Sequence, residues 1–264
     1  MSSPAGRRNR AVIGRVVSGA ETSRGFAGAW IAADAGKAVV PLPAHRGLSP
    51  MATARAIGGA REVGATGAWV VSFDARLADD DVVQSPLDAG QLWRLASQDS
   101  ADTAPLLLAD NLLGGVLSRP GHVLVAGTAD FVRGAVPEGA DEARARFRRY
   151  AERLRDAVPE LIRIADLHPA LNRAWATTAE VPATSHTGRQ LALMDGLVRR
   201  SLDGATFANR WLTARRAARD SGERVRDGIQ SVLDDVFYAL EDDLTEADLR
   251  RRVATALNAL RRYP

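Results

Sequence analysis

The sequence predicts an α+β protein, in which an N-terminal mixed α/β domain is followed by a C-terminal all-α antiparallel four-helix bundle. Two observations lead to this prediction. Short apolar runs bounded by Gly and Pro alternate with helical patterns up to about residue 135, whereas helical periodicity dominates from about residue 141 onward. The last stretch of the chain, from residue 186, holds four amphipathic segments joined by only a few residues, and such short connections make neighbouring helices antiparallel.

Composition restricts the classes of function. The chain has 264 residues and no cysteine, which excludes disulfides, thiolate metal sites and a thiol nucleophile. No run of about eighteen apolar residues occurs, so we expect no membrane-spanning helix. The N-terminus lacks the apolar stretch of a signal peptide. We therefore expect a soluble, cytoplasmic protein.

The positive charge is concentrated at one end of the chain. Residues 1–50 carry seven basic and two acidic side chains, whereas the remaining residues carry 28 basic and 30 acidic ones. Part of the excess lies in residues 1–10, which we expect to form a basic flexible tail. A nucleic-acid-binding surface would combine a basic stripe with interleaved aromatic residues, and the sequence contains no such stripe. We therefore expect no direct binding of nucleic acid.

Residues 11–167 form the predicted α/β domain, whose role the sequence does not indicate. Ser49 and Pro50 are typical of the cap and first residue of a helix. The pair Pro120-Gly121 is typical of a type II turn between two strands. We expect strands at 11–17, 27–33, 38–42, 68–73 and 105–109, helices at 49–63 and 87–96, and a hairpin at 116–125.

Glycine pairs and one glycine-containing segment are interpreted as turns in this domain. Residues 34–37 contain Gly36, which can adopt a positive φ without steric cost. Gly58-Gly59 and Gly114-Gly115 are also expected to form turns. Beyond the sheet, residues 142–166 are expected to be helical with a break near Pro159.

A connector at residues 168–185, rich in Thr, Ala and Pro, is expected to link this domain to the bundle at 186–264. The four predicted helices cover residues 186–202, 207–218, 223–243 and 245–260. Gly222 follows the second helix, and Thr245-Glu-Ala-Asp248 resembles the capping box that starts the fourth.

The third helix of the bundle has two distinct sides. Its apolar residues recur at steps of three and four and predict a core-facing stripe, formed by Val225, Ile229, Val232, Leu233, Val236, Phe237 and Leu240. Acidic residues and one tyrosine point elsewhere, namely Asp227, Asp234, Asp235, Tyr238, Glu241 and Asp242. This pattern is typical of a structural helix whose outer surface meets a positively charged partner.

The sequence gives little support to catalysis. The four histidines, His45, His122, His168 and His186, share no metal-ligand spacing. Neither a nucleophile elbow nor a phosphate-binding glycine motif occurs. Asp74, with the acidic run 79–81 behind it, is the best catalytic candidate, but a solvated acidic loop explains these residues better. We therefore expect a protein that is not an enzyme, with no metal and no cofactor.

Residues 186–262 resemble the colicin D immunity protein family. The stretches 194–211, 232–243 and 245–260 carry this resemblance, above all the sequence Leu-Asp-Asp-Val-Phe-Tyr at 233–238 that leads into an acidic helix end. Members of that family are small helical proteins that bind the C-terminal ribonuclease domain of a cognate toxin. The toxin cleaves transfer RNA in its anticodon loop, and the immunity protein blocks the basic cleft that would hold the RNA.

The resemblance implies a toxin nuclease domain as the partner and an acidic helix face as the contact surface. The implied partner-binding residues are Asp234, Asp235, Tyr238, Glu241 and Asp242. Carboxylates on such a face can occupy the sites of RNA phosphates, and complementary charge speeds the encounter. Residues 186–264 contain 14 arginines and 12 acidic residues, so the mimicry of RNA has to be local.

Two other functions remain open at this point. The chain could be an interaction or structural subunit of a larger assembly, with the bundle as its docking unit. Less favoured is an enzyme built on the N-terminal α/β domain, in which Asp74 would be the first residue to substitute.

Overall fold

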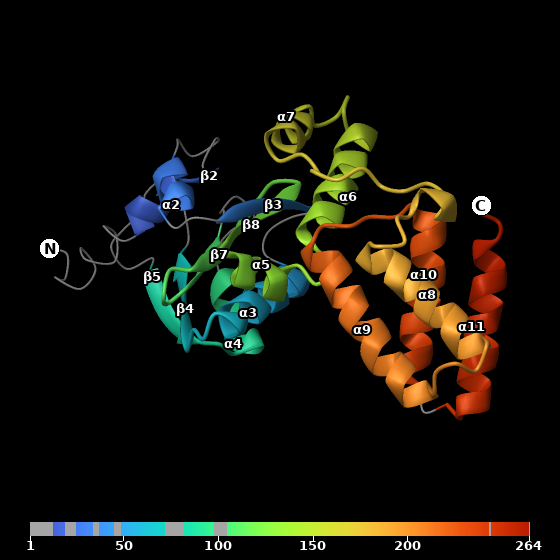
Figure 1. The fold of residues 1–264 in the computed structure, drawn as a ribbon. Coiled ribbons are helices and arrows are strands. Elements are labelled where there is room, and N and C mark those ends of the chain that lie inside the picture. Colours follow the sequence, from blue (N-terminus) through green and yellow to red (C-terminus); the bar gives the residue numbers. More distant parts are fainter. Residues whose placement is uncertain are drawn as a thin grey trace, which may run out of the picture. The chain divides into compact units, whose positions relative to one another are not determined.

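In the computed structural model the chain divides into two compact units, Met1–Pro169 and Ala170–Pro264 (Figure 1). The structure describes residues 13–18, 25–33, 37–44, 49–71, 82–97, 105–242 and 244–263. The tail at 1–10, most of the turn predicted at 34–37, His45 and the acidic residues Asp74 and 79–81 lie outside these ranges. Helices and an antiparallel sheet occur together in the chain, which confirms the prediction of a protein that combines α and β structure.

The N-terminal unit is built on a six-stranded sheet of order β3-β8-β7-β6-β4-β5, in which every neighbouring pair is antiparallel. A separate pair of short strands, β1 and β2, precedes it. The elements of the unit are β1 Val17–Ser18, β2 Gly25–Phe26, α2 Gly28–Ala32, β3 Ala38–Pro43, α3 Pro50–Glu62, β4 Gly67–Val71, β5 Val82–Pro86, α4 Ala89–Ser97, β6 Leu106–Ala109, β7 Gly114–Arg119, β8 His122–Gly127, α5 Ala129–Ala135, α6 Ala140–Arg153 and α7 Glu160–Leu167.

Both faces of the central strands are buried. Leu107 and Val125 point into a core that also contains residues of α3, α4 and α5. Leu106 and Leu124 point to the other face, where they meet Trp30 of α2. Because side chains alternate between the two faces of a strand, strands covered on both sides have continuous apolar runs, as in β6 and β8.

Several predicted elements are confirmed. Strand β3 and helix α3 lie where the sequence predicts them, and the Ser49 side chain accepts a hydrogen bond from the N–H of Ala52 at 3.2 Å. The hairpin β7–β8 turns at Pro120-Gly121, where Gly121 has a φ of +79°. The predicted helices at 87–96 and 142–166 correspond to α4 and to the pair α6 and α7.

The strand predicted at 27–33 is wrong, and so is the one at 11–17 over residues 13–16, although Val17 begins β1. Residues 28–32 form helix α2, and residues 13–16 are helical as well. A short run of Ala, Val and Ile can form either a strand or a buried turn of helix. Here the helical form buries Trp30 against the sheet. Strand β5 and helix α5 were not anticipated in the sequence.

The turns predicted at Gly58-Gly59 and Gly114-Gly115 are also wrong. The first pair lies within α3 and the second begins β7. A Cβ atom at position 58 would lie 2.6 Å from the carbonyl oxygen of Gly134, and one at position 114 would lie 2.1 Å from Cγ of Phe131. These glycines permit the close approach of α3 to α5 and of Phe131 to the sheet.

Strand β3 is an edge strand that α6 partly covers. Arg144 of α6 donates two hydrogen bonds to the carbonyl oxygen of Val39, from Nε at 3.2 Å and from Nη2 at 2.9 Å. The N–H of Ala44 points toward the neighbouring hairpin and donates to Gly121. Since backbone direction alternates along a strand, the backbone groups of Val39, Pro41 and Pro43 face the open edge.

In the C-terminal unit, four helices contribute to one hydrophobic cluster that includes Met194, Phe207, Trp211, Ile229 and Val253. Helix α8 packs against α9 and α11, and α10 packs against α11. The elements are the 3-10 helix η2 Thr178–Glu180 and the helices α8 His186–Val198, α9 Gly204–Asp220, α10 Asp227–Glu241 and α11 Glu246–Leu260. None of the described helices is long and apolar enough to cross a membrane.

The segment that precedes α8 pairs with distant parts of the same unit. Trp175 forms an isolated parallel bridge with Val225, so Val225 lies before α10 and not on it as the apolar pattern suggested. The N–H of Thr178 donates to the carbonyl oxygen of Tyr263 at 2.7 Å. Residues 170–185 are therefore built into the C-terminal unit.

Glu223, in the loop between α9 and α10, binds the start of α8. Its carboxylate accepts hydrogen bonds from the N–H groups of His186 and Thr187 at 2.9 and 2.8 Å, and from the Thr187 hydroxyl at 2.9 Å. Ser185 caps the same helix by accepting from the N–H of Gly188. The free N–H groups of the helix terminus are thus satisfied by a carboxylate, which the helix dipole also favours.

His122 is a buried titratable group in the N-terminal unit. Its side chain packs near Phe147, with ring centroids 6.1 Å apart, and Nδ1 lies 3.3 Å from the carbonyl oxygen of Pro120. Burial lowers the pKa of His122 to about 4, and the nearby positive charge of Arg119 acts in the same direction. The hydrogen bond to Pro120 opposes this effect in part.

We expect Gly114→Ala to destabilise the N-terminal unit by about 3 kcal/mol, because the added methyl group would overlap the ring of Phe131. The measurement is urea unfolding followed by tryptophan fluorescence. Gly90→Ala in α4 is the matched control, since its Cβ would meet nothing closer than an Asp88 oxygen at 3.5 Å. An equal effect of the two substitutions would contradict the packing argument.

We expect His122 to make the N-terminal unit less stable in acid. Between its unfolded pKa near 6.5 and its folded pKa of about 4, the unfolded chain binds the proton more readily, so stability falls as pH falls through this window. From pH 7 to pH 5.5 the loss due to His122 should be about 1 kcal/mol. His122→Phe should remove this part of the loss of stability at low pH. The measurement is the urea unfolding transition of the N-terminal unit, which is the transition that Gly114→Ala shifts. Identical pH dependence of the variant and the parent protein would refute the assignment.

Candidate functional site

The outer face of α10 is the candidate site. Asp235, Tyr238 and Asp242 follow one another at spacings of three and four residues, which places them on one side of the helix. Glu241 adjoins them, and all four side chains are exposed. The core side of the same helix is formed by Ile229, Val232, Leu233, Val236 and Ala239. The acidic face therefore points away from the hydrophobic cluster, and we call Asp235, Tyr238, Glu241 and Asp242 the acidic face of α10.

The carboxylates of this face are available to an external partner. Within the described ranges, Asp235, Glu241 and Asp242 take part in no ion pair, although many other surface acids of the chain do. Tyr238 is 61% exposed, and its ring makes an edge contact with Phe237 at a centroid distance of 5.8 Å. An exposed aromatic ring between carboxylates can provide both apolar contact and a hydroxyl group.

The position of these acids along the helix opposes local stability. Glu241 is the last residue of α10 and Asp242 is its C-cap, while no basic residue lies in the last turn. The carboxyl end of a helix carries a partial negative charge, so acids there are repelled by about 0.3–1 kcal/mol each. Helix stability thus does not account for the two acids, and an approaching cation would relieve the repulsion.

Asp234 has a different environment from the other predicted residues. Its Oδ1 accepts hydrogen bonds from Nη2 of Arg215 at 2.5 Å and from Nε2 of Gln230 at 2.8 Å. The Arg215 guanidinium also lies over the rings of Trp211 and Phe237, at 5.5 and 5.0 Å from their centroids. Asp234 therefore ties α10 to α9, and its carboxylate is already engaged within the unit.

The residues considered for catalysis or metal binding are not brought together where they are described. His122 begins β8, His168 is the C-cap of α7 and His186 begins α8. No group of three or more His, Asp or Glu side chains in the described part of the chain is arranged to hold a metal ion. Those positions therefore provide no chemical centre comparable to the acidic face of α10.

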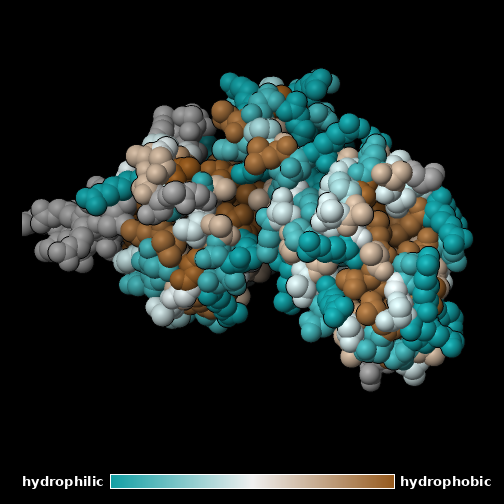
Figure 2. All heavy atoms as spheres, in the orientation of Figure 1, coloured by the Kyte–Doolittle hydropathy of each residue, from teal (hydrophilic) through white to brown (hydrophobic). Residues whose placement is uncertain are grey.

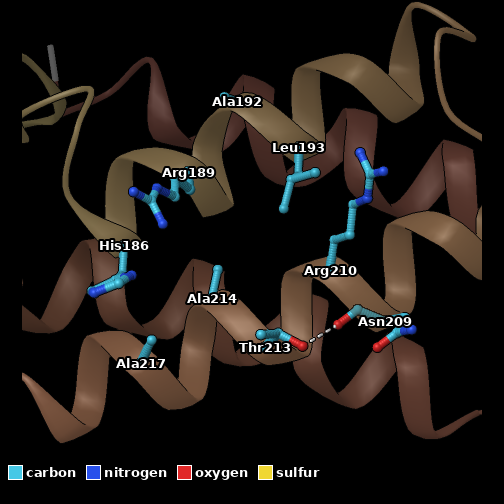
Figure 3. Close-up of a pocket in the computed structure, with 9 residues that line it drawn as sticks. All are labelled: His186, Arg189, Ala192, Leu193, Asn209, Arg210, Thr213, Ala214 and Ala217. Carbon is cyan, nitrogen blue, oxygen red and sulfur yellow. Dashed lines mark hydrogen bonds between the residues drawn. The ribbon is translucent and has the colours of Figure 1, made fainter.

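A groove between α8 and α9 was missed in the sequence. It has a volume of about 720 Å³ and contains no acidic residue in its lining. Figure 3 shows side chains from both helices projecting into the same space. The lining residues are His186, Arg189, Ala192, Leu193, Asn209, Arg210, Thr213, Ala214 and Ala217. The i, i+3 and i+4 spacing of these positions could have suggested a shared side of each helix, but it does not show that the two helices leave a groove between them.

Comparison of the chain with protein-family models, with curated proteins and with solved structures gives no match. The functional argument therefore depends on the residues themselves.

Proposed function

We propose that this chain is an immunity-type protein that binds a toxin ribonuclease domain of the tRNase kind and inhibits it through the acidic face of α10. In this proposal the C-terminal helices form the antiparallel four-helix bundle predicted from the sequence, and the protein acts in the cytoplasm, where transfer RNA is found. It requires no cofactor and performs no catalysis. The observation that carries the proposal is the set of exposed carboxylates without ion-pair partners in the described ranges, on the side of α10 opposite the core.

The chemistry of the target explains why such a face would inhibit it. A ribonuclease binds its substrate largely through contacts to phosphate groups, so its cleft has to present Arg and Lys side chains. Carboxylates can accept the same charge-assisted hydrogen bonds as phosphate oxygens. A row of carboxylates held on a rigid helix can therefore occupy the cleft in place of RNA.

Within this proposal the five residues have two roles. Asp235, Glu241 and Asp242 would accept hydrogen bonds from the cationic cleft, and Tyr238 would supply a central aromatic contact of the kind that dominates many interfaces. Asp234 would act indirectly, because its bond to Arg215 fixes the rotation of α10 relative to α9.

The arginine content of the unit restricts the contact area. Many arginines are paired with acids inside the unit, as in Arg199–Asp195 and Arg250–Glu246. These pairs carry little net charge, whereas the acidic face of α10 has a local excess of negative charge. A cationic partner would consequently be attracted to α10 and not to the unit as a whole.

The test requires a ribonuclease toxin domain encoded by a neighbouring gene, and absence of binding to any such domain would contradict the proposal. We expect the double substitution Asp235→Arg and Glu241→Arg to weaken binding about a hundredfold or more, because each reversal replaces an attraction by a repulsion in the contact. Binding is measured by calorimetry, and inhibition by cleavage of transfer RNA. Added salt should slow association of the parent chain more than that of the variant.

A matched control reverses the same number of charges elsewhere in the unit. Asp195→Arg with Asp220→Arg changes two half-exposed acids of α8 and α9, whose carboxylates pair only with the nearby Arg199 and Arg219 in the described part of the chain. This control should bind as tightly as the parent chain. Equal affinity of both double variants, with folding verified by circular dichroism, would eliminate α10 as the contact surface.

A further inference from the structure

We propose that the groove between α8 and α9 is a binding site for a small amphipathic organic anion, with a carboxylate head group and an aliphatic body. This site is separate from the acidic face of α10 and takes a ligand of the opposite charge. The chemical class of the ligand is inferred from three properties of the groove, namely its volume, the positive charge along its rim and the apolar side chains of its floor.

The volume of about 720 Å³ lies within the range of small-molecule sites, which is roughly 300–1,000 Å³. The floor is apolar, because Leu193 and the alanines at positions 192, 214 and 217 contribute only hydrocarbon side chains to the lining. No Phe, Tyr or Trp lines the groove, and the imidazole of His186 lies at one end of it, so the apolar floor offers no aromatic ring on which a nucleobase could stack. The floor therefore fits an aliphatic chain better than a nucleotide.

The charged and polar lining residues select an anion. Arg189 and Arg210 are exposed, and neither forms an ion pair in the part of the chain that the structure describes. The Thr213 hydroxyl already donates its proton to the backbone carbonyl oxygen of Asn209. The uncharged donor that remains for a ligand beside Arg210 is therefore the side-chain amide of Asn209. Guanidinium groups bind carboxylates in a bidentate manner, which makes them suited to fix such a head group.

The two arginines lie at different places along the groove, with Leu193 between them and the Arg189 guanidinium directed toward the His186 end (Figure 3). Arg210 of α9 lies beside Leu193 of α8, and Arg189 lies one turn back along α8 (Figure 3). Either guanidinium group can therefore bind the carboxylate, while the aliphatic body lies over Leu193 and Ala214 between them.

The nearest carboxylate at the His186 end does not compete with a ligand. Glu223 uses both oxygens to accept hydrogen bonds from the backbone of His186 and from Thr187. Its charge is thus directed at the terminus of α8, where the helix dipole partly offsets it.

Figure 2 shows apolar residues exposed between hydrophilic ones on the viewed face of the C-terminal unit, as a site of this kind requires.

The test is calorimetric titration of the full chain with dodecanoate below its micelle concentration. We expect saturable one-to-one binding, and much weaker binding of both butyrate and dodecyltrimethylammonium, which lack the long body and the negative charge respectively. Arg189→Gln with Arg210→Gln should weaken dodecanoate binding about tenfold or more. Ala217→Phe, which fills the groove without changing charge, should have a similar effect.

The control Arg216→Gln with Arg261→Gln removes two exposed arginines outside the groove and should leave the affinity unchanged. Circular dichroism verifies that each variant is folded, and Ala217→Phe provides an independent test if the double variant is not. The proposal is overturned if dodecanoate does not bind, if the ammonium compound binds as tightly, or if neither groove variant weakens binding. Self-association of the chain through this groove in place of dodecanoate binding would also overturn it.

Discussion

The arrangement of the C-terminal unit depends on the bond between Glu223 and the start of α8. One carboxylate receives three hydrogen bonds from His186 and Thr187, and it comes from the loop that joins α9 to α10. This contact fixes where α8 begins relative to the helices that follow it. Because the next residues, Arg224 and Val225, pair with the segment around Trp175, the same loop also determines where α10 starts. The groove and the acidic face of α10 both take their positions from this loop.

Helix α9 separates two surfaces of opposite charge. Its residues 210, 214 and 217 line the groove, whereas Arg215 lies on another side of the helix and bonds to Asp234 of α10. The arginines of α9 therefore differ in role: one neutralises an acid within the unit, and another faces an apolar groove. A sum of charges over the unit hides this division, because positive and negative surfaces cancel in the total.

Local sequence patterns predict the longer helices correctly, but they do not predict the contacts between residues far apart in the chain. Caps such as Ser49 and Thr245 act on groups three residues away, so the sequence reveals them directly. Short segments were misjudged when their structure depends on distant contacts. Residues 28–32 become helical because Trp30 packs on the sheet, and Gly114 is required by Phe131, which follows it by more than a dozen residues. A pattern that spans a few residues contains no information on such partners.

The same limit applies to the candidate site. Helical periodicity alone places Asp235, Tyr238 and Asp242 on one face of α10, which the sequence predicts correctly as a helix. Periodicity does not show that Asp234 is engaged by Arg215, nineteen positions earlier in the chain. The groove is a property of two helices together, so neither helix reveals it separately.

The covered edge of β3 has a consequence for the behaviour of the chain in concentrated solution. Of the backbone positions that face outward at 39, 41 and 43, only Val39 has an N–H group, because the other two are prolines. The carbonyl oxygen of Val39 is taken by Arg144. An incoming strand from another molecule would find a single N–H donor, and the acceptor beside it is already bound by Arg144, so a regular ladder of hydrogen bonds is disfavoured at this edge although the Pro41 and Pro43 carbonyls also face it. Proline placement thus disfavours strand addition at the β3 edge of a sheet whose central strands are apolar.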